Sequence, residues 1–284
     1  MRDRTKDIEM LDETLQICEQ GYYEMEGEKK PLKITRRRME NTKVFLPDEI
    51  ATLKADIGLD SDSMPETACE NIDSFAMARE LDAGRISDKH VLVLNLANAV
   101  HPGGGVRKGS HAQEEDLCRK SSLLVSLESK AARRFYDYNW SIHTFMGSDA
   151  AIVTPEVEII RDIDGSLLQE STVVSVMTCA APNIRNGMEG MSLNEYQAIL
   201  YNRIISMLTV AASEGYNVLV LGAFGCGAFH NDAKLVSQLF YKGIKAFSYK
   251  GRSSEKLFNK IAFAVLDNRR NGFYNFNSFN RCFG

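Results

Sequence analysis

The sequence predicts an α/β fold: a three-layer α/β/α sandwich with a mixed, mostly parallel sheet and an α-rich N-terminal extension. Two segments, Val91–Leu94 and residues 217–224, are apolar at nearly every position, which is typical of strands buried on both faces of a parallel sheet. Helical patterns alternate with such strands along the chain, as layered α/β folds require. The 284 residues are enough for one large domain with an extension.

The sequence of the first 62 residues predicts the N-terminal extension. Apolar side chains recur at helical spacing through residues 7–20, and Gly21 follows as a natural helix end. Gly27 separates two short strand-like pieces, which predicts a hairpin. The basic run at residues 35–38 predicts an exposed helix face paired with nearby acids, in preference to a phosphate site. We place the extension at residues 1–62 and expect it to pack on a main domain at residues 63–284.

The sequence of the main domain predicts alternating strands and helices after a boundary loop. Residues 59–75 are polar and contain a proline, so we expect a loop there. The elements expected after it are a helix at 72–84, a strand at 91–94, a helix at 114–129, two strands joined by a turn at 164–165, a strand at 171–183, a long helix at 193–215, a strand at 217–224, a helix at 231–248 and a strand at 260–267.

Composition excludes several classes of protein. A formal net charge of −4 gives no general attraction to nucleic acid or to an anionic membrane. No apolar run approaches the roughly 18 residues of a membrane span, and the first ten residues lack the apolar core of a signal peptide. The six cysteines are scattered without a CxxC pair, which predicts reduced thiols and a cytoplasmic location. The five histidines form no HExxH motif, so we expect no metal site and no cofactor.

Two glycine-rich loops each follow a buried strand. The first contains Gly103, Gly104 and Gly105, and the second contains Gly225 and Gly227. Ligands of open α/β sheets bind at the carboxyl ends of strands, and glycines there expose backbone N–H groups to phosphate. The two loops favour a ligand with more than one phosphate over two structural turns. Neither loop continues into GK[ST] or forms GxGxxG, which disfavours nucleoside triphosphatases and Rossmann dehydrogenases.

Glu114 and Glu115 are adjacent at a predicted helix start, and two readings of this pair remain open. Acids in a first helical turn are favoured by the helix dipole, so the pair can be structural. Successive helical residues point about 100° apart, so the two carboxyls can also have different roles. One would hold a sugar, and the other would be a general acid with a raised pKa, because cleavage of a glycoside needs a proton on the leaving oxygen.

Polar and aromatic residues near the two loops also allow two readings. Asn95 and Asn98 flank the strand end, where asparagine either caps a turn or binds ribose hydroxyls. Phe224 and Phe229 lie in the second loop, where an aromatic ring either packs inward or forms the wall of a pocket.

These motifs resemble a known family. LNLAN (94–98) is similar to the strand end of macrodomains, the ADP-ribose-binding fold, and three glycines followed after seven residues by QEE (113–115) resemble the signature of poly(ADP-ribose) glycohydrolases. GAFGCGAFHND (222–232), TCAAPN (178–183) and the N-terminal segment are similar to the bacterial-type branch. The likeness runs over nearly the whole chain.

The resemblance implies roles for individual residues. Glu115 would be the catalytic acid, and it would then deprotonate the attacking water. Glu114 would orient ribose hydroxyls, Asn98 would bind the distal ribose, and Gln113 would support the glutamates. Phe229 would press on the distal ribose. The diphosphate would lie between two loops, and the adenine would lie near the start of the main domain. The diphosphate-binding residues would be Gly103, Gly104, Gly105 and Val106 in the first loop and Gly225, Cys226, Gly227, Ala228 and Phe229 in the second. The adenine would contact Asn71 and Ile72.

The implied activity is hydrolysis of ribose–ribose O-glycosidic bonds in poly(ADP-ribose), with release of ADP-ribose, by an exo-acting enzyme that needs no metal. Its partners would be poly(ADP-ribose) or ADP-ribosylated proteins. Residues 185–195 and the tail 268–284 are candidates to cover the adenosine side. Two alternatives stay open: a macrodomain that binds ADP-ribose without catalysis, and a hydrolase of another ADP-ribosyl linkage. The glutamate pair favours the enzyme.

Overall fold

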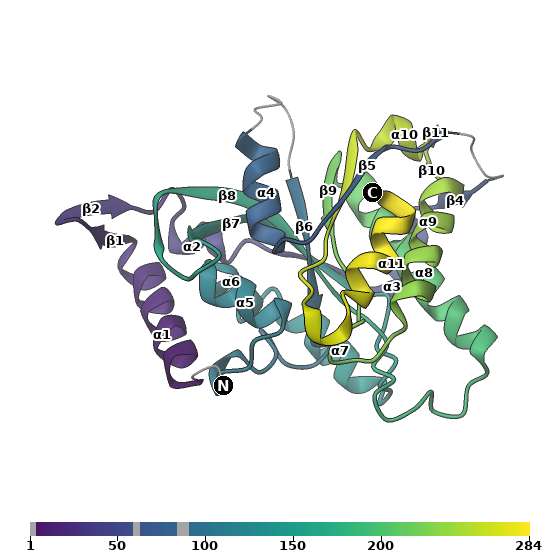
Figure 1. Ribbon diagram of the computed structural model, residues 1–284, viewed down its shortest axis with the longest axis horizontal. Coiled ribbons are helices and arrows are strands. Elements are labelled where there is room, and N and C mark those ends of the chain that lie inside the picture. Colours follow the sequence, from purple (N-terminus) through teal and green to yellow (C-terminus); the bar gives the residue numbers. More distant parts are fainter. Residues whose placement is uncertain (1–3, 59–62, 84–90) are drawn as a thin grey trace.

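A seven-stranded mixed sheet lies between two layers of helices in the computed structural model, which describes residues 4–58, 63–83 and 91–284 (Figure 1). The five strands from β8 to β5 run parallel, whereas β7 is antiparallel to β8 and β3 to β7. The predicted α/β sandwich is confirmed. In spatial order the strands are β3 (Lys43–Phe45), β7 (Ala151–Arg161), β8 (Leu167–Ala180), β6 (Val91–Ala97), β9 (Val218–Leu221), β12 (Lys260–Ala264) and β5 (Glu66–Glu70).

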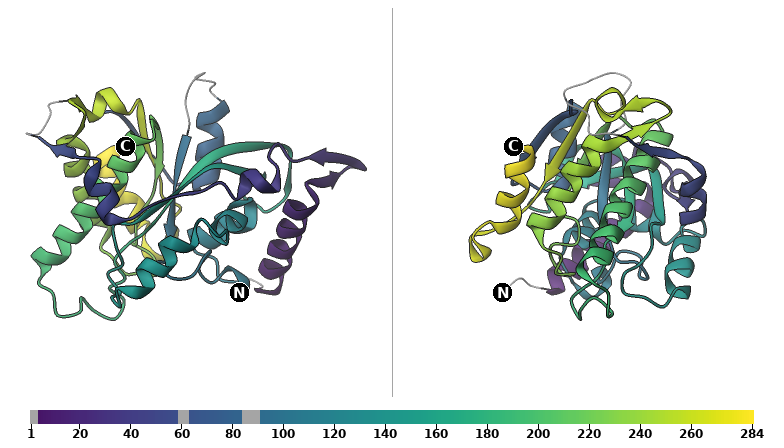
Figure 2. Two further views of the ribbon diagram at one scale, coloured as in Figure 1. Left: turned by 180° about the vertical axis from the view of Figure 1, so that it is seen from behind. Right: turned by 90° about the vertical axis from the view of Figure 1, so that its right-hand side faces the viewer.

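Helices cover both faces of the sheet, as the views in Figure 2 show. A separate apolar core joins each helical layer to its face of the sheet. Each helix buries one stripe of apolar side chains against the strands, which is what stabilises such layers. One layer contains α1 (Arg4–Gln20), α4 (Ser74–Ala83), α5 (Gln113–Lys120), α6 (Leu123–Leu127) and α7 (Arg133–Ser141). The other contains α3 (Pro47–Thr52), α8 (Leu193–Ser213), α9 (Ala233–Ala246) and α11 (Tyr274–Phe283).

Smaller elements extend these layers. The predicted N-terminal hairpin is present, and a separate three-stranded sheet of order β11-β10-β4 lies beyond the end of α9. None of the described helices is long and apolar enough to cross a membrane. The remaining elements are β1 (Tyr22–Met25), β2 (Glu28–Pro31), α2 (Arg36–Met39), β4 (Ala55–Ile57), β10 (Phe247–Tyr249), β11 (Arg252–Ser253), α10 (Ser254–Leu257) and the 3₁₀ turns η1 (Val106–Lys108) and η2 (Arg269–Asn271).

Three predicted elements were wrong in extent or type. Residues 66–70 form the edge strand β5, which pairs with β12, instead of a loop. The sequence did not reveal this strand because only Cys69 in it is buried, so the apolar alternation of a strand is missing. Residues 59–62 of the predicted loop lie outside the described residues. The helix expected at 114–129 is broken at Ser121, whose extended backbone forms a bridge to Ile159. The strand expected at 171–183 is the continuation of β8.

The basic run at residues 35–38 is ion-paired, as predicted. Arg36 contacts Glu40 at 3.0 Å and Glu19 at 3.2 Å, and Arg38 pairs with Glu156. These pairs are largely exposed, so each contributes little to stability. The run therefore belongs to the surface of α2.

The N-terminal segment is bonded into the sheet at two places. Strand β3 pairs with β7, and the fully buried Glu158 carboxylate on β7 accepts hydrogen bonds from the backbone N–H groups of Lys33 (2.8 Å) and Ile34 (3.0 Å) and from the Ser171 hydroxyl (2.6 Å). The segment thus contributes a strand as well as helices. The domain division at residue 62 stays a prediction.

Glu158→Ala should lower the free energy of unfolding by about 2–4 kcal/mol, because it leaves buried N–H donors without an acceptor. Chemical denaturation monitored by circular dichroism measures this change. The matched control is Glu170→Ala, at an exposed carboxylate that contacts only the Lys33 side chain, which should change the free energy by less than about 0.5 kcal/mol. Equal stabilities of the two variants would show that Glu158 does not anchor the N-terminal segment.

Candidate active site

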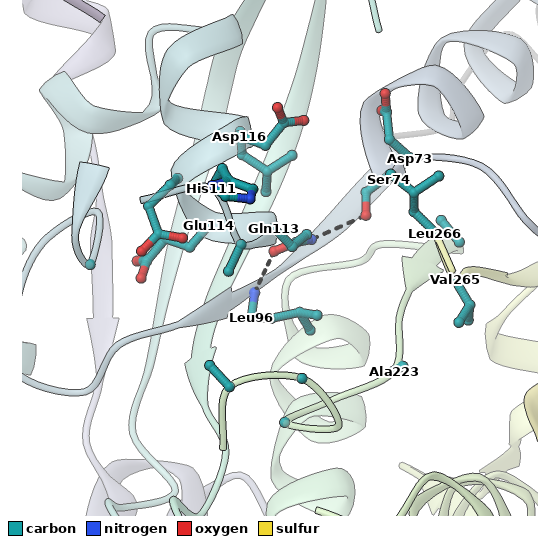
Figure 3. A pocket seen from close by; sticks show the side chains of 18 of the residues that line it. Asp73, Ser74, Leu96, His111, Gln113, Glu114, Asp116, Ala223, Val265 and Leu266 are labelled. Carbon is teal, nitrogen blue, oxygen red and sulfur yellow. Dashed lines mark hydrogen bonds between the residues drawn. The ribbon is translucent and has the colours of Figure 1, made fainter. Parts of the chain in front are cut away.

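A cavity of about 410 Å³ lies at the carboxyl ends of β6, β8, β9 and β12 (Figure 3). This is the edge of a parallel sheet at which α/β proteins bind ligands. The cavity walls come from the segments after these strands, from the starts of α4 and α5, from the tip of the β7–β8 hairpin at Ile163, and from the C-terminal segment at Leu266 and Asn275. Both predicted glycine loops reach it.

Gln113 fixes the start of α5 to strand β6. Strand β6 pairs with β9 only as far as Val93, although it stays paired with β8 to Ala97. Beyond Val93 the Gln113 amide replaces strand β9 as the hydrogen-bond partner of β6. Its oxygen accepts from Leu96 N (2.9 Å), and its nitrogen donates to Leu94 O (2.7 Å) and to Ser74 Oγ (3.1 Å). Figure 3 shows the bonds to Leu96 and Ser74. The cavity thus opens where β9 leaves β6, and Gln113 satisfies the backbone groups freed there.

Glu114 is a buried carboxyl held by hydrogen bonds. Its oxygens accept from the backbone N–H of Asn98 (2.7 Å) and from the Asn95 amide (3.3 Å). Burial disfavours the charged form, and it raises the pKa of Glu114 from 4.5 to about 8. The carboxyl of Glu114 is therefore mainly neutral at pH 7.

Glu115 presents one oxygen without a partner. Its Oε1 accepts from the backbone N–H of Gly105 at 2.8 Å, whereas Oε2 is buried and has no hydrogen-bond partner within the described chain. A buried carboxyl oxygen without a donor is costly. Glu115 lines the cavity, so a ligand that forms a hydrogen bond with Oε2 would remove this cost.

The first glycine loop packs directly against the two carboxyls. Gly104 has a φ of +58°, and a Cβ there would lie 2.6 Å from Glu115 Oε1 and 3.0 Å from Glu114 Oε2, so only glycine fits. Its backbone donors are in use: Gly104 N bonds His101 O (3.0 Å), Gly105 N bonds Glu115, and Val106 N bonds Gly103 O (3.1 Å). The expectation of bare N–H groups is wrong for residues 104–106, because this loop spends them on holding itself and Glu115.

The second glycine loop carries the free donors. Among the described hydrogen bonds, none is donated by the backbone N–H groups of residues 227–229. Asn231 holds this loop: its buried amide nitrogen donates to Gly225 O and Pro182 O, both at 2.9 Å, and its oxygen accepts from the Tyr196 hydroxyl. A Cβ on Gly225 would lie 2.1 Å from that nitrogen. The loop is thus a rigid anion-binding candidate.

Asn98 is oriented by its own loop. Its Oδ1 accepts from Val100 N and His101 N, both at 2.9 Å. The amide nitrogen makes no hydrogen bond within the described chain and belongs to a residue that lines the cavity. Asn98 can therefore donate to a ligand oxygen while its backbone donates to Glu114.

The structure brings ten of the predicted site residues to the lining of the cavity, and the other five do not line it. Asn71 bonds the backbone of Asp267 instead, and Val106 is fully buried. The lining residues are Ile72, Asn98, Gly104, Gln113, Glu114, Glu115, Gly225, Gly227, Ala228 and Phe229, and those that do not line it are Asn71, Gly103, Gly105, Val106 and Cys226.

Several site residues were not singled out from the sequence. Asn231 supports the second loop, Ser74 supports Gln113, and Leu266 and Asn275 line the cavity. Asn231 stands within the glycine motif, so its place there was a usable signal. The other three have no local pattern. No group of three or more His, Cys, Asp or Glu with metal-binding arrangement occurs among the described residues.

Comparison with known proteins gives one family. The model of the microbial-type PARG catalytic domain matches residues 12–162. The crystal structure of poly(ADP-ribose) glycohydrolase from Thermomonospora curvata bound to the inhibitor ADP-HPD is 31% identical, with a TM-score of 0.86, over 98% of this chain and 100% of that one. The enzyme from Deinococcus radiodurans in complex with ADP-ribose is 31% identical, with a TM-score of 0.74, over 87% of this chain and 96% of that one. No curated protein matches.

The raised pKa of Glu114 predicts a pH-dependent stability. The folded carboxyl binds its proton up to about pH 8, whereas the unfolded one releases it near pH 4.5. Its contribution is therefore fully present below pH 4.5 and is lost as pH rises to 8, with a slope of at most about 1.4 kcal/mol per pH unit. Glu114→Gln cannot ionise, so its free energy of unfolding relative to the wild type should rise over this window.

Urea denaturation at pH 5, 6, 7 and 8 measures that difference. Glu170→Gln, at an exposed carboxylate, serves as the control and should show a difference that does not change with pH. A constant difference between Glu114→Gln and the wild type across the window would contradict a neutral Glu114.

Proposed function

The chain belongs to the family of microbial-type poly(ADP-ribose) glycohydrolases, and we propose that Glu115 is the general acid and base of the hydrolysis. The enzyme is a glycosidase that cleaves poly(ADP-ribose). The observation that carries the proposal is the buried Oε2 of Glu115, which has no partner within the described chain and belongs to a residue that lines the cavity. Because Oε1 is fixed by Gly105, Oε2 is the oxygen left for a substrate.

The free donors suggest how one ADP-ribose unit is seated. Its diphosphate accepts hydrogen bonds from the N–H groups of residues 227–229, and the Asn98 amide donates to the distal ribose. Glu115 then protonates the ribose oxygen that leaves from the ribose–ribose bond, as an oxocarbenium-like transition state requires. The carboxylate left behind takes a proton from the attacking water, which returns Glu115 to its acid form and adds the hydroxyl to the released ADP-ribose.

Glu114 has a different role in this proposal. A carboxyl that is neutral below about pH 8 both accepts and donates hydrogen bonds, so it can hold ribose hydroxyls without placing a negative charge of its own beside the diphosphate. Its contact with Asn98 N fixes the same segment that presents the Asn98 amide. Glu114 therefore positions the sugar, and Glu115 transfers the proton.

The tail supports exo action. Of the two segments expected to cover the adenosine side, the C-terminal one lines the cavity through Asn275, whereas residues 185–195 do not line it. Leu266, just before that tail, also lines the cavity and is 65% exposed. A chain segment that lines this side of the cavity would favour the end of a polymer over its middle. We propose exo cleavage on this ground and cytoplasmic action on the six free cysteines.

Two alternatives lead to different assays. A macrodomain that only binds ADP-ribose would release no product from labelled polymer. A hydrolase of another ADP-ribosyl linkage would use the same carboxyls on a different leaving group, so turnover of poly(ADP-ribose) compared with mono-ADP-ribosylated protein separates it. The glutamate pair and the family favour polymer hydrolysis.

Glu115→Gln should lower the turnover of poly(ADP-ribose) by about 10²–10⁴-fold, as expected for the loss of a general acid, while the affinity for ADP-ribose stays close to that of the wild type. Release of labelled ADP-ribose and isothermal titration measure the two quantities. Glu170→Gln, the same substitution at an exposed carboxyl, is the control. Wild-type turnover in Glu115→Gln would remove this residue from the chemistry.

Gly104→Ala should reduce the turnover of poly(ADP-ribose) by about 10²-fold, because the new Cβ displaces the Glu115 carboxyl from its position and a misplaced catalytic group loses about that much rate. The matched control is Gly251→Ala, which has a similar positive φ of +72° and nothing within 4 Å of its Cβ. Both variants carry the left-handed strain of about 1–2 kcal/mol. The account requires that only Gly104→Ala loses activity, and equal activities in the two variants would contradict it.

A further inference from the structure

The segment around α9 has a charge opposite to that of the chain as a whole. Residues 233–260 carry seven lysines or arginines and one glutamate, although the chain has a net charge of −4. Surplus acids elsewhere hide this concentration in the overall composition. The cations are Lys234, Lys242, Lys245, Lys250, Arg252, Lys256 and Lys260, and the acid is Glu255.

Three of these lysines lie along the solvent side of α9. Lys234, Tyr241, Lys242 and Lys245 follow one another at helical spacing on the side away from the core, and the first three are exposed while Lys245 is half-buried. Residues so spaced share one helix face. We call these four residues the α9 basic face. In Figure 1, α9 lies on the outer side of the sheet beside α8 and α11.

The lysines of the α9 basic face are not neutralised by the described chain. No carboxylate lies within 4.0 Å of Lys234, Lys242 or Lys245 among the described residues, whereas Lys260 contacts Glu66 at 2.7 Å. Helix α11, which packs on α9, has no acidic residue. The positive field of this face is therefore open to a ligand from solution.

Aromatic rings accompany the lysines. Lys242 Nζ lies 5.3 Å from the centre of the Tyr201 ring and Lys245 Nζ lies 5.8 Å from that of Tyr241. Tyr241 is 40% exposed. Lysines for phosphate beside tyrosine rings for stacking are what proteins use to bind single-stranded polyanions with bases.

The α9 basic face begins close to the catalytic cavity. Helix α9 begins at Ala233, directly after the second glycine loop, and its N-cap Asp232 bonds Tyr274 at 2.8 Å, next to the cavity residue Asn275. The rise from Lys234 to Lys245 is about 16 Å. A polymer whose end lies in the cavity can therefore reach this face.

We propose that the α9 basic face binds poly(ADP-ribose) units other than the one being cleaved. The inference rests on the proposed function, because it extends the same substrate beyond the cavity. Each unit of the polymer offers a diphosphate to the lysines and an adenine to the exposed Tyr241 ring. The position of the face next to the second loop favours the enzyme's own polymer over an unrelated nucleic acid, which would not need access to the cavity.

The test compares binding of long poly(ADP-ribose) in a Glu115→Gln background with and without Lys234→Gln, Lys242→Gln and Lys245→Gln. The triple change should weaken polymer binding at least about tenfold at low salt and reduce the slope of log affinity against log salt by about 2, since each phosphate contact on a single strand contributes about 0.7. Binding of ADP-ribose itself should not change. The control is Lys29→Gln, Lys30→Gln and Lys130→Gln, an equal change of charge at surface lysines away from the site, one of which also lies over a tyrosine ring at 4.4 Å.

Each outcome decides the inference. Unchanged polymer binding in the triple variant, or an equal loss in the control, overturns it. The inference is also overturned, in favour of a general nucleic-acid surface, by one result with single-stranded DNA of equal charge. That result is DNA binding to the wild type as tight as polymer binding, together with loss of DNA binding when the same lysines are replaced. Failure of the proposed function is a separate result, since it appears as wild-type release of labelled ADP-ribose by the Glu115→Gln variant, which is measured apart from the binding comparison.

Discussion

Two backbone hydrogen bonds to adjacent carboxyls determine the rest of the site. The Asn98 N–H holds Glu114 at 2.7 Å and the Gly105 N–H holds Glu115 at 2.8 Å, so the segment after β6 and the start of α5 fix each other. Gln113 adds a third tie, from α5 to the backbone of β6. This arrangement demands glycine at position 104, because any side chain there would meet both carboxyls. Loop, strand end and helix start therefore form one unit.

Burial separates the chemistry of the two glutamates. Both lie at less than a tenth of their full exposure, but Glu114 accepts hydrogen bonds from Asn98 N and from the Asn95 amide and has a raised pKa, whereas Glu115 has one oxygen with a hydrogen-bond partner and one without a partner within the described chain. An enzyme holds such unfavourable groups because a substrate relieves the cost, and stability is given up for function. The second glycine loop follows the same logic, since Asn231 uses its own hydrogen bonds to keep the loop rigid and leaves the N–H groups of residues 227–229 free.

The fold and the site could be predicted from the sequence wherever a pattern of residues has a single physical cause. Strand segments buried on both faces are mostly apolar, so β6, β9, β12 and the second half of β8 were predictable, whereas the edge strands β3 and β5 bury too little to show alternation. The three glycines and the glutamate pair predicted the place of the site but not the direction of the donors, because which N–H groups of a loop are used internally depends on tertiary contacts such as Gly105 to Glu115. We expected the raised carboxyl pKa on the general acid, whereas the structure shows it for Glu114, the carboxyl that holds the sugar in our proposal, because burial of an individual carboxyl depends on tertiary packing.

The most direct measurement is a crystal structure of Glu115→Gln with bound ADP-ribose. The account predicts that the diphosphate accepts from the N–H groups of residues 227–229, that the distal ribose contacts Asn98 and Glu114, and that its anomeric carbon faces the side chain at position 115. A diphosphate held instead by residues 104–106, with the hydrogen bonds of the first loop broken, would contradict it. So would a distal ribose that lies away from both carboxyl positions.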